Sequence, residues 1–216
     1  MKIRRTANAG ILLELDGVTI LLDGVCREVK PYPATPLRER EALQQRFPDV
    51  IAFTHAHKDH YDPAFAALYQ KQTSGVILGP ENLPGCISSM EPFSANGVSV
   101  TPIPSRHIGA AGKTTPHASF VVEGSKCLWF MGDSSPVQWK NREDLPEPDV
   151  LVVPYAYANT PSGWAATKFL GAEYVVLLHM PDREEDTIGL WDAVTSVLKN
   201  EEKKPVILAM SEVIEI

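Results

Sequence analysis

Three of the six histidines in the chain lie in the segment 55–60, which reads HAHKDH and follows a short apolar run. In extended backbone, residues two apart project to the same side, so His55 and His57 can converge on one metal ion as the strand ends. If the chain then turns toward a following helix, Asp59 and His60 are carried past that ion and can hold a second one. The spacing therefore favours two adjacent metal sites over one.

Four ligands from one segment cannot complete two such sites, so further ligands must come from elsewhere in the chain. Three candidates each follow an apolar run that is typical of a buried strand, namely His107, Asp133 and His179. Alone, each could be an ordinary hydrogen-bonded histidine or a turn aspartate. Because the segment 55–60 lacks ligands, we expect all three to complete a metal centre along one rim of the fold.

The length of 216 residues suits one domain spanning 1–216. No apolar run reaches the roughly 18 residues of a membrane span, and the apolar run near the N-terminus is interrupted by Glu14, Asp16 and Asp23. We therefore expect a soluble protein without an export signal, located in the cytoplasm. The net charge of -7 weighs against a large basic face for nucleic acid.

The pattern of apolar residues predicts many strands and a few helices. Alternating runs at 10–15 and 18–22 flank Asp16-Gly17, a strong hairpin signal. Further strands are expected at 50–54, 76–78, 98–103, 118–123, 127–131, 150–154, 174–178 and 205–210, and helices at 36–47, 63–72, 162–170 and 184–199. This content favours an α/β fold with two sheets and helices packed outside them.

With these residues in place, the sequence resembles the metallo-β-lactamase fold hydrolases. Their HxHxDH signature is matched at 55–60, and their separate His, Asp and His are matched in the same order by His107, Asp133 and His179. The resemblance runs from the opening strands through His179 and implies an αββα sandwich with a dinuclear site at one edge. It also implies that the first metal is held by His55, His57 and His107, the second by Asp59, His60 and His179, and that Asp133 bridges both.

Two further positions extend the resemblance. The aspartate that closes an early strand in this family is matched by Asp23, which we expect to orient metal ligands through hydrogen bonds, although a plain turn aspartate is the alternative. Tyr61-Asp62 replaces a glycine-containing continuation that is common in the family. This departure resembles the branch with ascorbate-phosphate lactonase and the N-acyl phospholipid phosphodiesterases.

The reaction expected of such a site is hydrolysis. A water shared by two cations has its pKa lowered from about 15.7 toward 7 and can act as the nucleophile. Asp59 and Asp133 would position the water and the cations. We therefore expect a metal-dependent hydrolase of a small ester, lactone or phosphodiester. Two divalent ions are implied, with zinc as the principal candidate and manganese or iron as alternatives.

The remaining basic residues bear on the substrate. Arg106 and Lys113 lie in loops near proposed ligands and could meet an anionic group, so we expect a small anionic substrate rather than nucleic acid. His117 could line the pocket, or it could have a surface or hydrogen-bonded role. Two alternatives are a metal-dependent nuclease and a non-catalytic metal-binding or sensing domain. Oxygen-reducing relatives resemble HxExDH, whereas this chain has His57 at that position.

Overall fold

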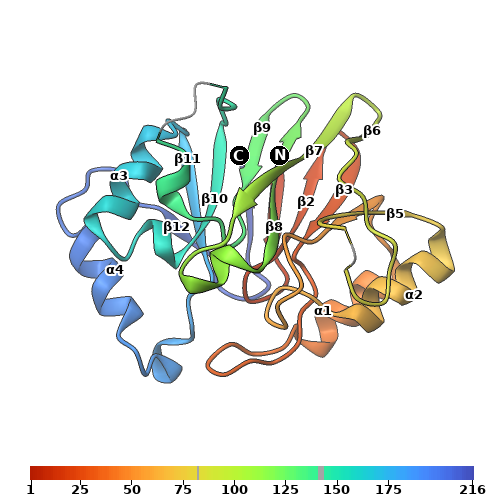
Figure 1. The fold of residues 1–216 in the computed structure, drawn as a ribbon, viewed down its shortest axis with the longest axis horizontal. Coiled ribbons are helices and arrows are strands. Elements are labelled where there is room, and N and C mark those ends of the chain that lie inside the picture. Colours follow the sequence, from red (N-terminus) through yellow and green to blue (C-terminus); the bar gives the residue numbers. More distant parts are fainter. Residues whose placement is uncertain (82, 141–143) are drawn as a thin grey trace.

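The computed structural model describes residues 1–81, 83–140 and 144–216, in which the strands form two sheets (Figure 1). In spatial order, the first sheet contains β13 (Val213–Glu215), β1 (Lys2–Arg5), β2 (Ile11–Leu15), β3 (Val18–Leu22), β4 (Val50–Ala52) and β5 (Val76–Leu78). The second contains β12 (Val206–Ile207), β11 (Tyr174–Leu178), β10 (Val150–Pro154), β9 (Cys127–Phe130), β8 (Pro116–Glu123), β7 (Val98–Arg106) and β6 (Phe93–Ala95).

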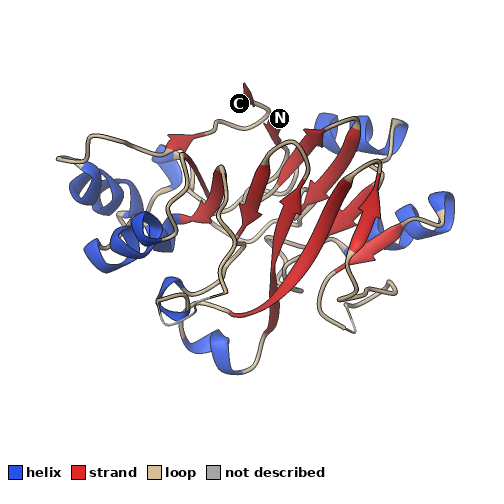
Figure 2. Cartoon of the chain, turned by 90° about the horizontal axis from the view of Figure 1, so that it is seen from above, coloured by secondary structure: helices blue, strands red, loops and turns tan. Residues whose placement is uncertain are grey.

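Helices cover the outer face of each sheet. The four α-helices of the described ranges are α1 (Leu37–Gln45), α2 (Pro63–Thr73), α3 (Pro161–Phe169) and α4 (Leu190–Leu198). One hydrophobic cluster joins α1 and α2 to β3, β4 and β5, and another joins α3 and α4 to β9, β10 and β11. The helices accordingly flank the strands on both sides (Figure 2). The αββα sandwich expected from the sequence is confirmed.

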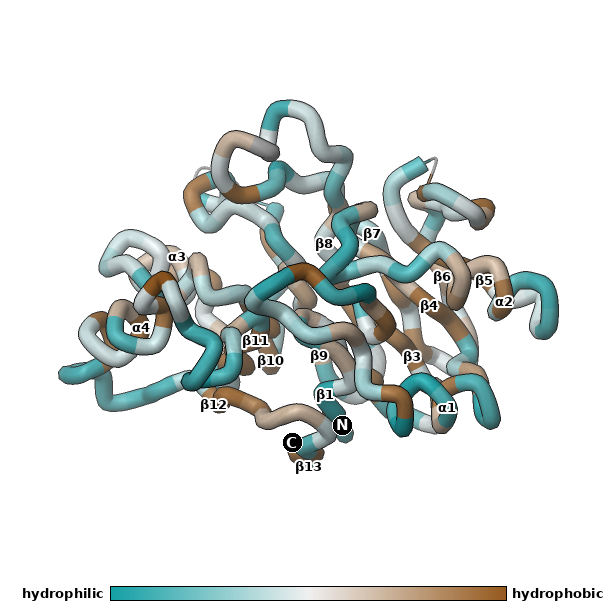
Figure 3. The backbone as a smooth tube through the Cα atoms, turned by 90° about the horizontal axis from the view of Figure 1, so that it is seen from below, coloured by the Kyte–Doolittle hydropathy of each residue, from teal (hydrophilic) through white to brown (hydrophobic). Residues whose placement is uncertain are grey.

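The main core lies between the two sheets. Successive residues of a strand point to opposite faces, so Ile20 and Leu22 of β3 enter this core while Leu21 between them faces the helices. Phe120 of β8 and Phe130 of β9 fill the same layer from the second sheet. Hydrophobic residues are concentrated along the strands, whereas many of the outer loops are hydrophilic (Figure 3). Central strands such as β4 and β10 are thus buried on both faces, which fixes their ends in place.

Most predicted elements are present with small changes in their bounds. In the predicted hairpin, β2 and β3 pair antiparallel, and Asp16 and Gly17 both have positive φ at the turn. The predicted strand 205–210 is wrong beyond Val206–Ile207, because residues 209–212 form a turn in which the backbone N–H of Glu212 donates to the carbonyl of Ala209. Strands β1, β6 and β13 were not expected from the sequence.

The helix predicted at 184–199 is also wrong in its first half. Residues Arg183–Glu185 form a single 3₁₀ turn, and α4 begins only at Leu190. Gly189 has φ 71, a left-handed conformation that interrupts a helix, and the Asp186 carboxylate accepts hydrogen bonds from the first backbone N–H groups of α4. A glycine and a capping aspartate therefore set the true start of this helix.

The strands place their carboxyl ends along one edge of the sandwich. Strands β3 and β4 are parallel, and β9, β10 and β11 are parallel, while β7 runs in the same direction as β9 because both are antiparallel to β8. At this edge the backbone N–H of Ala118 donates to the carbonyl of Thr54 at 2.9 Å, which joins the two sheets. Residues that follow these strands are therefore brought together. None of the helices in the described residues has the length and apolarity needed to cross a membrane.

Candidate metal centre

The structure brings all seven predicted ligand residues together at this edge. Their side chains form three overlapping groups, which are His55 with His57 and His107, His55 with His60 and Asp133, and Asp59 with His60 and His179. Within each group the ligand atoms lie within 4.8 Å of one another. The first and third groups have the same members as the two ligand sets expected from the sequence. The first and third groups share no residue, so each offers its own set of candidate ligands.

Asp133 lies between the two outer groups. Its Oδ2 atom is 3.5 Å from Nε2 of His60 and 3.6 Å from Nε2 of His107, and its Oδ1 atom is 3.7 Å from Nε2 of His179. Nε2 of His179 also lies 3.3 Å from a carboxylate oxygen of Asp59. One carboxylate thus faces histidines of both groups, which is the position expected of a bridging residue.

The chemistry of the unpartnered donor atoms fits a cation. Among the described residues, Nε2 of five histidines and Oδ1 of Asp133 are buried without a hydrogen-bond partner, the histidines being His55, His60, His107, His117 and His179. Leaving one buried polar atom unsatisfied costs about 1–3 kcal/mol, so several at one point require an explanation. A small cavity of about 10 Å³ adjoins His60, Asp133 and His179. These atoms are the ones that a metal ion would satisfy.

Asp23 holds two of these histidines in the orientation that metal binding requires. Nδ1 of His60 donates to Oδ2 of Asp23 at 2.8 Å, since an ionised carboxylate can only accept. The Thr54 hydroxyl donates to the same oxygen at 2.6 Å and accepts from Nδ1 of His55 at 2.9 Å. The backbone N–H of Thr54 donates to Oδ1 of Asp23 at 2.7 Å. Both imidazoles therefore carry a proton on Nδ1, so Nε2 is the nitrogen that can bind a metal ion.

His107 and His179 are oriented by other groups. Nδ1 of His107 donates to the carbonyl of Ile108 at 2.8 Å. Nδ1 of His179 lies 3.5 Å from the side-chain nitrogen of Asn8, whose Oδ1 is buried without a partner in the described structure. The amide nitrogen of Asn8 therefore faces Nδ1 of His179 and helps to fix the orientation of this ring.

The backbone around His179 supports this contact. His179 has φ 61, a conformation that is uncommon for a residue other than glycine, and its N–H donates to the carbonyl of Asn8 at 3.3 Å. The buried guanidinium of Arg5 in turn donates to the carbonyls of Ala7, Asn8 and Leu208. The loop that contacts His179 is thus held rigidly against the end of β11.

Burial and neighbouring charges prepare the ligands for an ion. Burial lowers the pKa of His55 well below its usual value, and His60 adds to this effect, so His55 stays neutral. Burial alone would raise the pKa of Asp133, but His179 and His60 hold it well below its usual range. Burial alone would lower the pKa of His60, but the Asp133 and Asp23 carboxylates raise it well above 6.5. In the metal-free protein His60 is therefore protonated between two carboxylates, and an ion must displace that proton.

The sixth histidine also joins the cluster. His117 is only 6% exposed, its Nδ1 lies 2.8 Å from the hydroxyl oxygen of Ser105, and its Nε2 is buried without a partner in the described residues. Its ring centroid is 5.1 Å from that of His55 and 5.7 Å from that of His107. Burial lowers its pKa to about 3. His117 is therefore buried and hydrogen-bonded beside His55 and His107 and does not lie at the surface, while a role in lining the pocket stays a prediction.

The predicted anion-binding residues lie at the rim. Arg106 immediately precedes His107, and both Arg106 and Lys113 are exposed. Lys113 ends a short 3₁₀ turn that packs on this segment, since a side chain at Gly112 would come within 2.3 Å of the His107 carbonyl. Neither side chain belongs to the ligand groups. A role in substrate binding stays a prediction for both.

Sequence reasoning missed four residues that contact the cluster: Thr54, Asn8, Tyr32 and Tyr155. Tyr32 and Tyr155 pack edge-on against His179, with ring centroids 4.4 Å and 5.5 Å away. Burial, together with the nearby Asp133, raises the pKa of Tyr155. Thr54 could have been noticed because it lies between a buried strand and His55. The contacts of the other three join segments far apart in the chain, and no local signal marks them.

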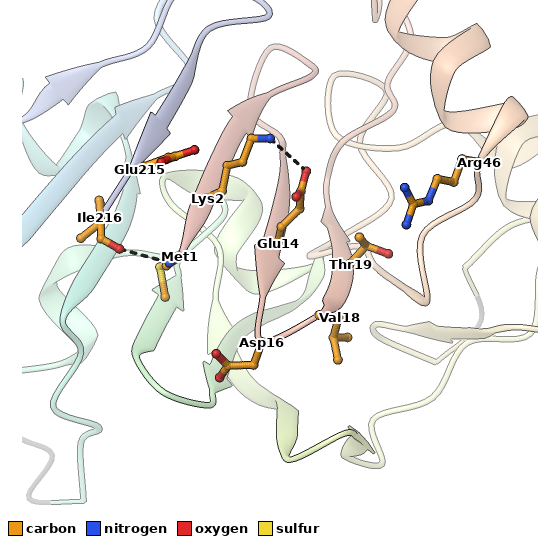
Figure 4. Close-up of a pocket in the computed structure, with 10 residues that line it drawn as sticks. Met1, Lys2, Glu14, Asp16, Val18, Thr19, Arg46, Glu215 and Ile216 are labelled. Carbon is orange, nitrogen blue, oxygen red and sulfur yellow. Dashed lines mark hydrogen bonds and ion pairs between the residues drawn. The ribbon is translucent and has the colours of Figure 1, made fainter.

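A larger hollow elsewhere is unrelated to this cluster. It has a volume of about 570 Å³ and is lined by the hairpin turn, the start of β3 and both chain ends (Figure 4). Asp16 and Thr19 lie there, at the opposite end of β3 from Asp23, and Lys2 pairs with Glu14 across its wall. With no histidine in its lining, this hollow offers no comparable set of metal ligands.

Comparison with known families agrees with the geometry. Residues 19–183 match the family described as the beta-lactamase superfamily domain, which is more than half of the chain. The chain belongs to the β-lactamase superfamily. The predicted family is therefore confirmed, and with it the expectation of an enzyme of the metallo-β-lactamase type. A comparison with curated proteins gives no match.

Solved structures of this superfamily share the fold at low sequence identity. A possible metal-dependent hydrolase from Veillonella parvula has a TM-score of 0.73 and 16% identity over 100% of this chain and 99% of its own. An isothiocyanate hydrolase from Delia radicum gut bacteria has a TM-score of 0.69 and 16% identity over 100% of this chain and 99% of its own. CmlA, a diiron β-hydroxylase from Streptomyces venezuelae, has a TM-score of 0.68 and 13% identity over 100% of this chain and 54% of its own. At these identities the likeness concerns the fold.

Proposed function

We propose that this member of the β-lactamase superfamily is a hydrolase that uses two divalent metal ions to cleave a small ester, lactone or phosphodiester. The observation that carries the proposal is the set of buried, unpartnered histidine nitrogens around Asp133. His55, His60, His107 and His179 each have their other ring nitrogen in contact with a protein group, as is usual for histidines that bind metal.

Two ligand sets follow from the groups of side chains. His55, His57 and His107 would hold one ion, Asp59, His60 and His179 would hold the other, and Asp133 would be shared. His57 is the exposed member of the first set, so this ion would lie nearer to solvent. The sets include histidine and carboxylate but no thiolate, a combination that zinc, manganese and iron all accept. We propose zinc as the first metal to test.

Bound divalent ions would lower the pKa of a water and polarise the scissile carbonyl or phosphoryl oxygen. The chain supplies the fixed surroundings for this chemistry. Asp133, ionised in its buried position, offers one oxygen toward each histidine group. Thr54 and Asp23 hold the Nδ1 protons of His55 and His60, so Nε2 is the nitrogen left for an ion, after the second proton of His60 has been displaced. Asp59 stands beside His179, is partly exposed, and could orient the attacking water.

We further propose that the substrate is a small anion. Two divalent ions add four positive charges at this edge, and the exposed Arg106 and Lys113 lie on the segment that carries His107. His117 borders the same side and could contact the substrate through its free Nε2. A cytoplasmic location likewise stays a prediction from the sequence.

The test combines metal analysis with a substrate screen. Protein loaded with zinc, manganese or iron(II) would be assayed against nitrophenyl esters, lactones, phosphorylated lactones, bis-nitrophenyl phosphate and an isothiocyanate. We expect close to two ions per chain and turnover of at least one compound, both reduced in Asp133→Ala. The control is Asp192→Ala, which removes an exposed carboxylate on α4 away from the cluster. Full metal content and activity in Asp133→Ala would refute the assignment.

The screen also separates the two alternatives. Cleavage of RNA or DNA that is lost in Asp133→Ala, with no turnover of any small compound, would favour a nuclease. The net charge of -7 argues against this outcome because extended phosphate contacts need basic surface. Tight binding of two ions without turnover of any compound or nucleic acid would favour a metal-binding or sensing role.

A further inference from the structure

Two tyrosines from distant segments pack against one histidine of the cluster. Tyr32 lies between β3 and α1, and its ring is 4.4 Å from that of His179 at an interplanar angle of 89°. Tyr155 directly follows β10, and its ring is 5.5 Å from that of His179 at 76°. Both rings are half-buried. They form an aromatic wall on the side of the centre that holds Asp59 and His179.

The hydroxyl groups of these tyrosines differ from those of the other enclosed tyrosines. The hydroxyl of Tyr61 donates to the carbonyl of Pro84, and that of Tyr69 donates to the carbonyl of Asp49. The hydroxyl of Tyr157 is bonded to Ser134 and Trp139.

In contrast, neither the Tyr32 nor the Tyr155 hydroxyl has a hydrogen-bond partner in the described part of the chain. Neither hydroxyl oxygen is among the buried atoms that lack a partner, so both are accessible from outside the described chain. Packing against His179 alone would be served equally well by phenylalanine, and the two accessible hydroxyls can therefore meet a ligand.

The surroundings define what these hydroxyls would bind. Tyr32 and Tyr155 lie close enough to Asp59 and Asp133 for the two carboxylates to act on both phenols electrostatically. A phenol is uncharged near neutral pH and offers one O–H donor, so it suits an oxygen acceptor. Once ions neutralise the carboxylates, a substrate oxygen at this edge would be the acceptor nearest to the pair.

We propose that Tyr32 and Tyr155 are substrate-contacting residues whose hydroxyls donate hydrogen bonds to an oxyanion group, of the phosphoryl or carboxylate type, on the Asp59–His179 side of the centre. The inference deepens the proposed function, since it takes this edge as the place where substrate binds. It assigns recognition to neutral donors on this side, whereas Arg106 and Lys113 lie on the side of His107.

The test measures anion binding and does not depend on turnover. Inorganic phosphate would be titrated by calorimetry into desalted, zinc-loaded protein, comparing the wild type with Tyr32→Phe, Tyr155→Phe and the double variant. Each lost hydrogen bond should weaken phosphate binding about 3- to 10-fold, and the double variant should lose more than either single one. Acetate, titrated in parallel, tells whether a carboxylate is accepted as well. The control is Tyr174→Phe, at the start of β11 and far along the strand from His179, which should bind phosphate like the wild type.

Metal content and thermal unfolding of every variant separate recognition from packing. Two ions per chain and an unchanged melting temperature are expected, because phenylalanine keeps the aromatic contact with His179. Wild-type affinity for phosphate in the double variant, loss of metal in either single variant, or no phosphate binding by the wild type would each overturn the inference. If phosphate binding weakens as expected but no compound in the substrate screen is turned over, the anion site stands and the hydrolase proposal fails.

Discussion

Replacing Asp23 by asparagine tests how the chain prepares two metal ligands at once. Asp23 is fully buried and accepts hydrogen bonds from the Thr54 N–H, the Thr54 hydroxyl and Nδ1 of His60. Asparagine has nearly the same shape, and its oxygen can still accept from the Thr54 N–H. Its NH₂ group, however, takes the place of the carboxylate oxygen that faces the other two donors.

The new donor reverses both hydrogen bonds. Facing the asparagine NH₂, Nδ1 of His60 must become an acceptor, which moves the imidazole proton to Nε2. The Thr54 hydroxyl must likewise accept from the amide, so it turns its own hydrogen toward Nδ1 of His55. Both histidines then carry a proton on the nitrogen that would bind metal.

The expected loss can be estimated for each ion. Changes to a group that orients a metal ligand typically weaken metal binding roughly 10- to 100-fold, or about 1.4–2.7 kcal/mol. Because His55 and His60 belong to different ligand groups, Asp23→Asn should weaken both ions. Thr54→Val removes only the hydroxyl beside His55 and leaves the contact between Asp23 and His60. It should therefore weaken mainly the ion held with His107.

The assay is competition for zinc with a chromophoric chelator, with folding checked by near-ultraviolet circular dichroism. A matched control exists at the other end of β3, where a carboxylate oxygen of Asp49 accepts from the N–H and hydroxyl of Thr19, both at 2.7 Å, with no histidine involved. Asp49→Asn repeats the same substitution in a similar Asp–Thr pair and should leave both zinc affinities unchanged. Two ions bound to folded Asp23→Asn with wild-type affinity would refute the tautomer argument.

Three further outcomes are expected. Metal affinity should rise as pH increases, because the Asp133 and Asp23 carboxylates raise the pKa of His60 and its proton must leave before an ion binds. Calorimetry in buffers of different ionisation enthalpy should detect the released proton. Metal binding that is independent of pH and releases no proton would contradict this expectation. Removing the metal ions with a chelator should abolish activity and lower the melting temperature, yet thermal unfolding should remain cooperative. Loss of the near-ultraviolet circular dichroism signal at low temperature would instead show that the fold needs metal. Phe120 is fully buried between the sheets, so Phe120→Ala should reduce the free energy of unfolding by about 3–5 kcal/mol in urea titrations. A change in this free energy below about 1 kcal/mol would contradict the packing role of Phe120.

The ligand groups could be predicted because each member is marked by its own neighbourhood in the sequence. His179 directly follows five apolar residues, and Asp133 follows the apolar run that contains β9. A buried strand has a definite end, and strands that run in one direction end at one edge. Residue type at a strand end therefore predicts position in space. Within the segment 55–60, by contrast, the ligand residues are only two or three positions apart, so their proximity follows from the local sequence.

The groups that orient the ligands could not be predicted in the same way. Asn8 and His179 are separated by 171 positions, and their contact depends on how β1, β2 and β11 are stacked. Tyr32 lies in a connection whose course is not set by any periodic pattern. The early break before α4 is different, since Gly189 and Asp186 are both visible in the sequence and are typical signals of a helix start. That error came from reading apolar periodicity without its capping residues.

The cost of burying unpartnered imidazole nitrogens explains why the histidines gather at the edge of the sandwich and not in its core. An imidazole nitrogen left without a partner in a buried position costs about 1–3 kcal/mol, so the metal-free fold is destabilised wherever such atoms collect. Placed at the strand ends, they leave the layer between the sheets entirely hydrophobic, as Ile20, Leu22 and Phe130 illustrate. The sandwich can then fold on its own core, and an ion that satisfies the free nitrogens adds stability through binding. Because the hydrophobic packing between the sheets does not involve the metal-binding side chains, the fold can tolerate unsatisfied histidine nitrogens at its edge.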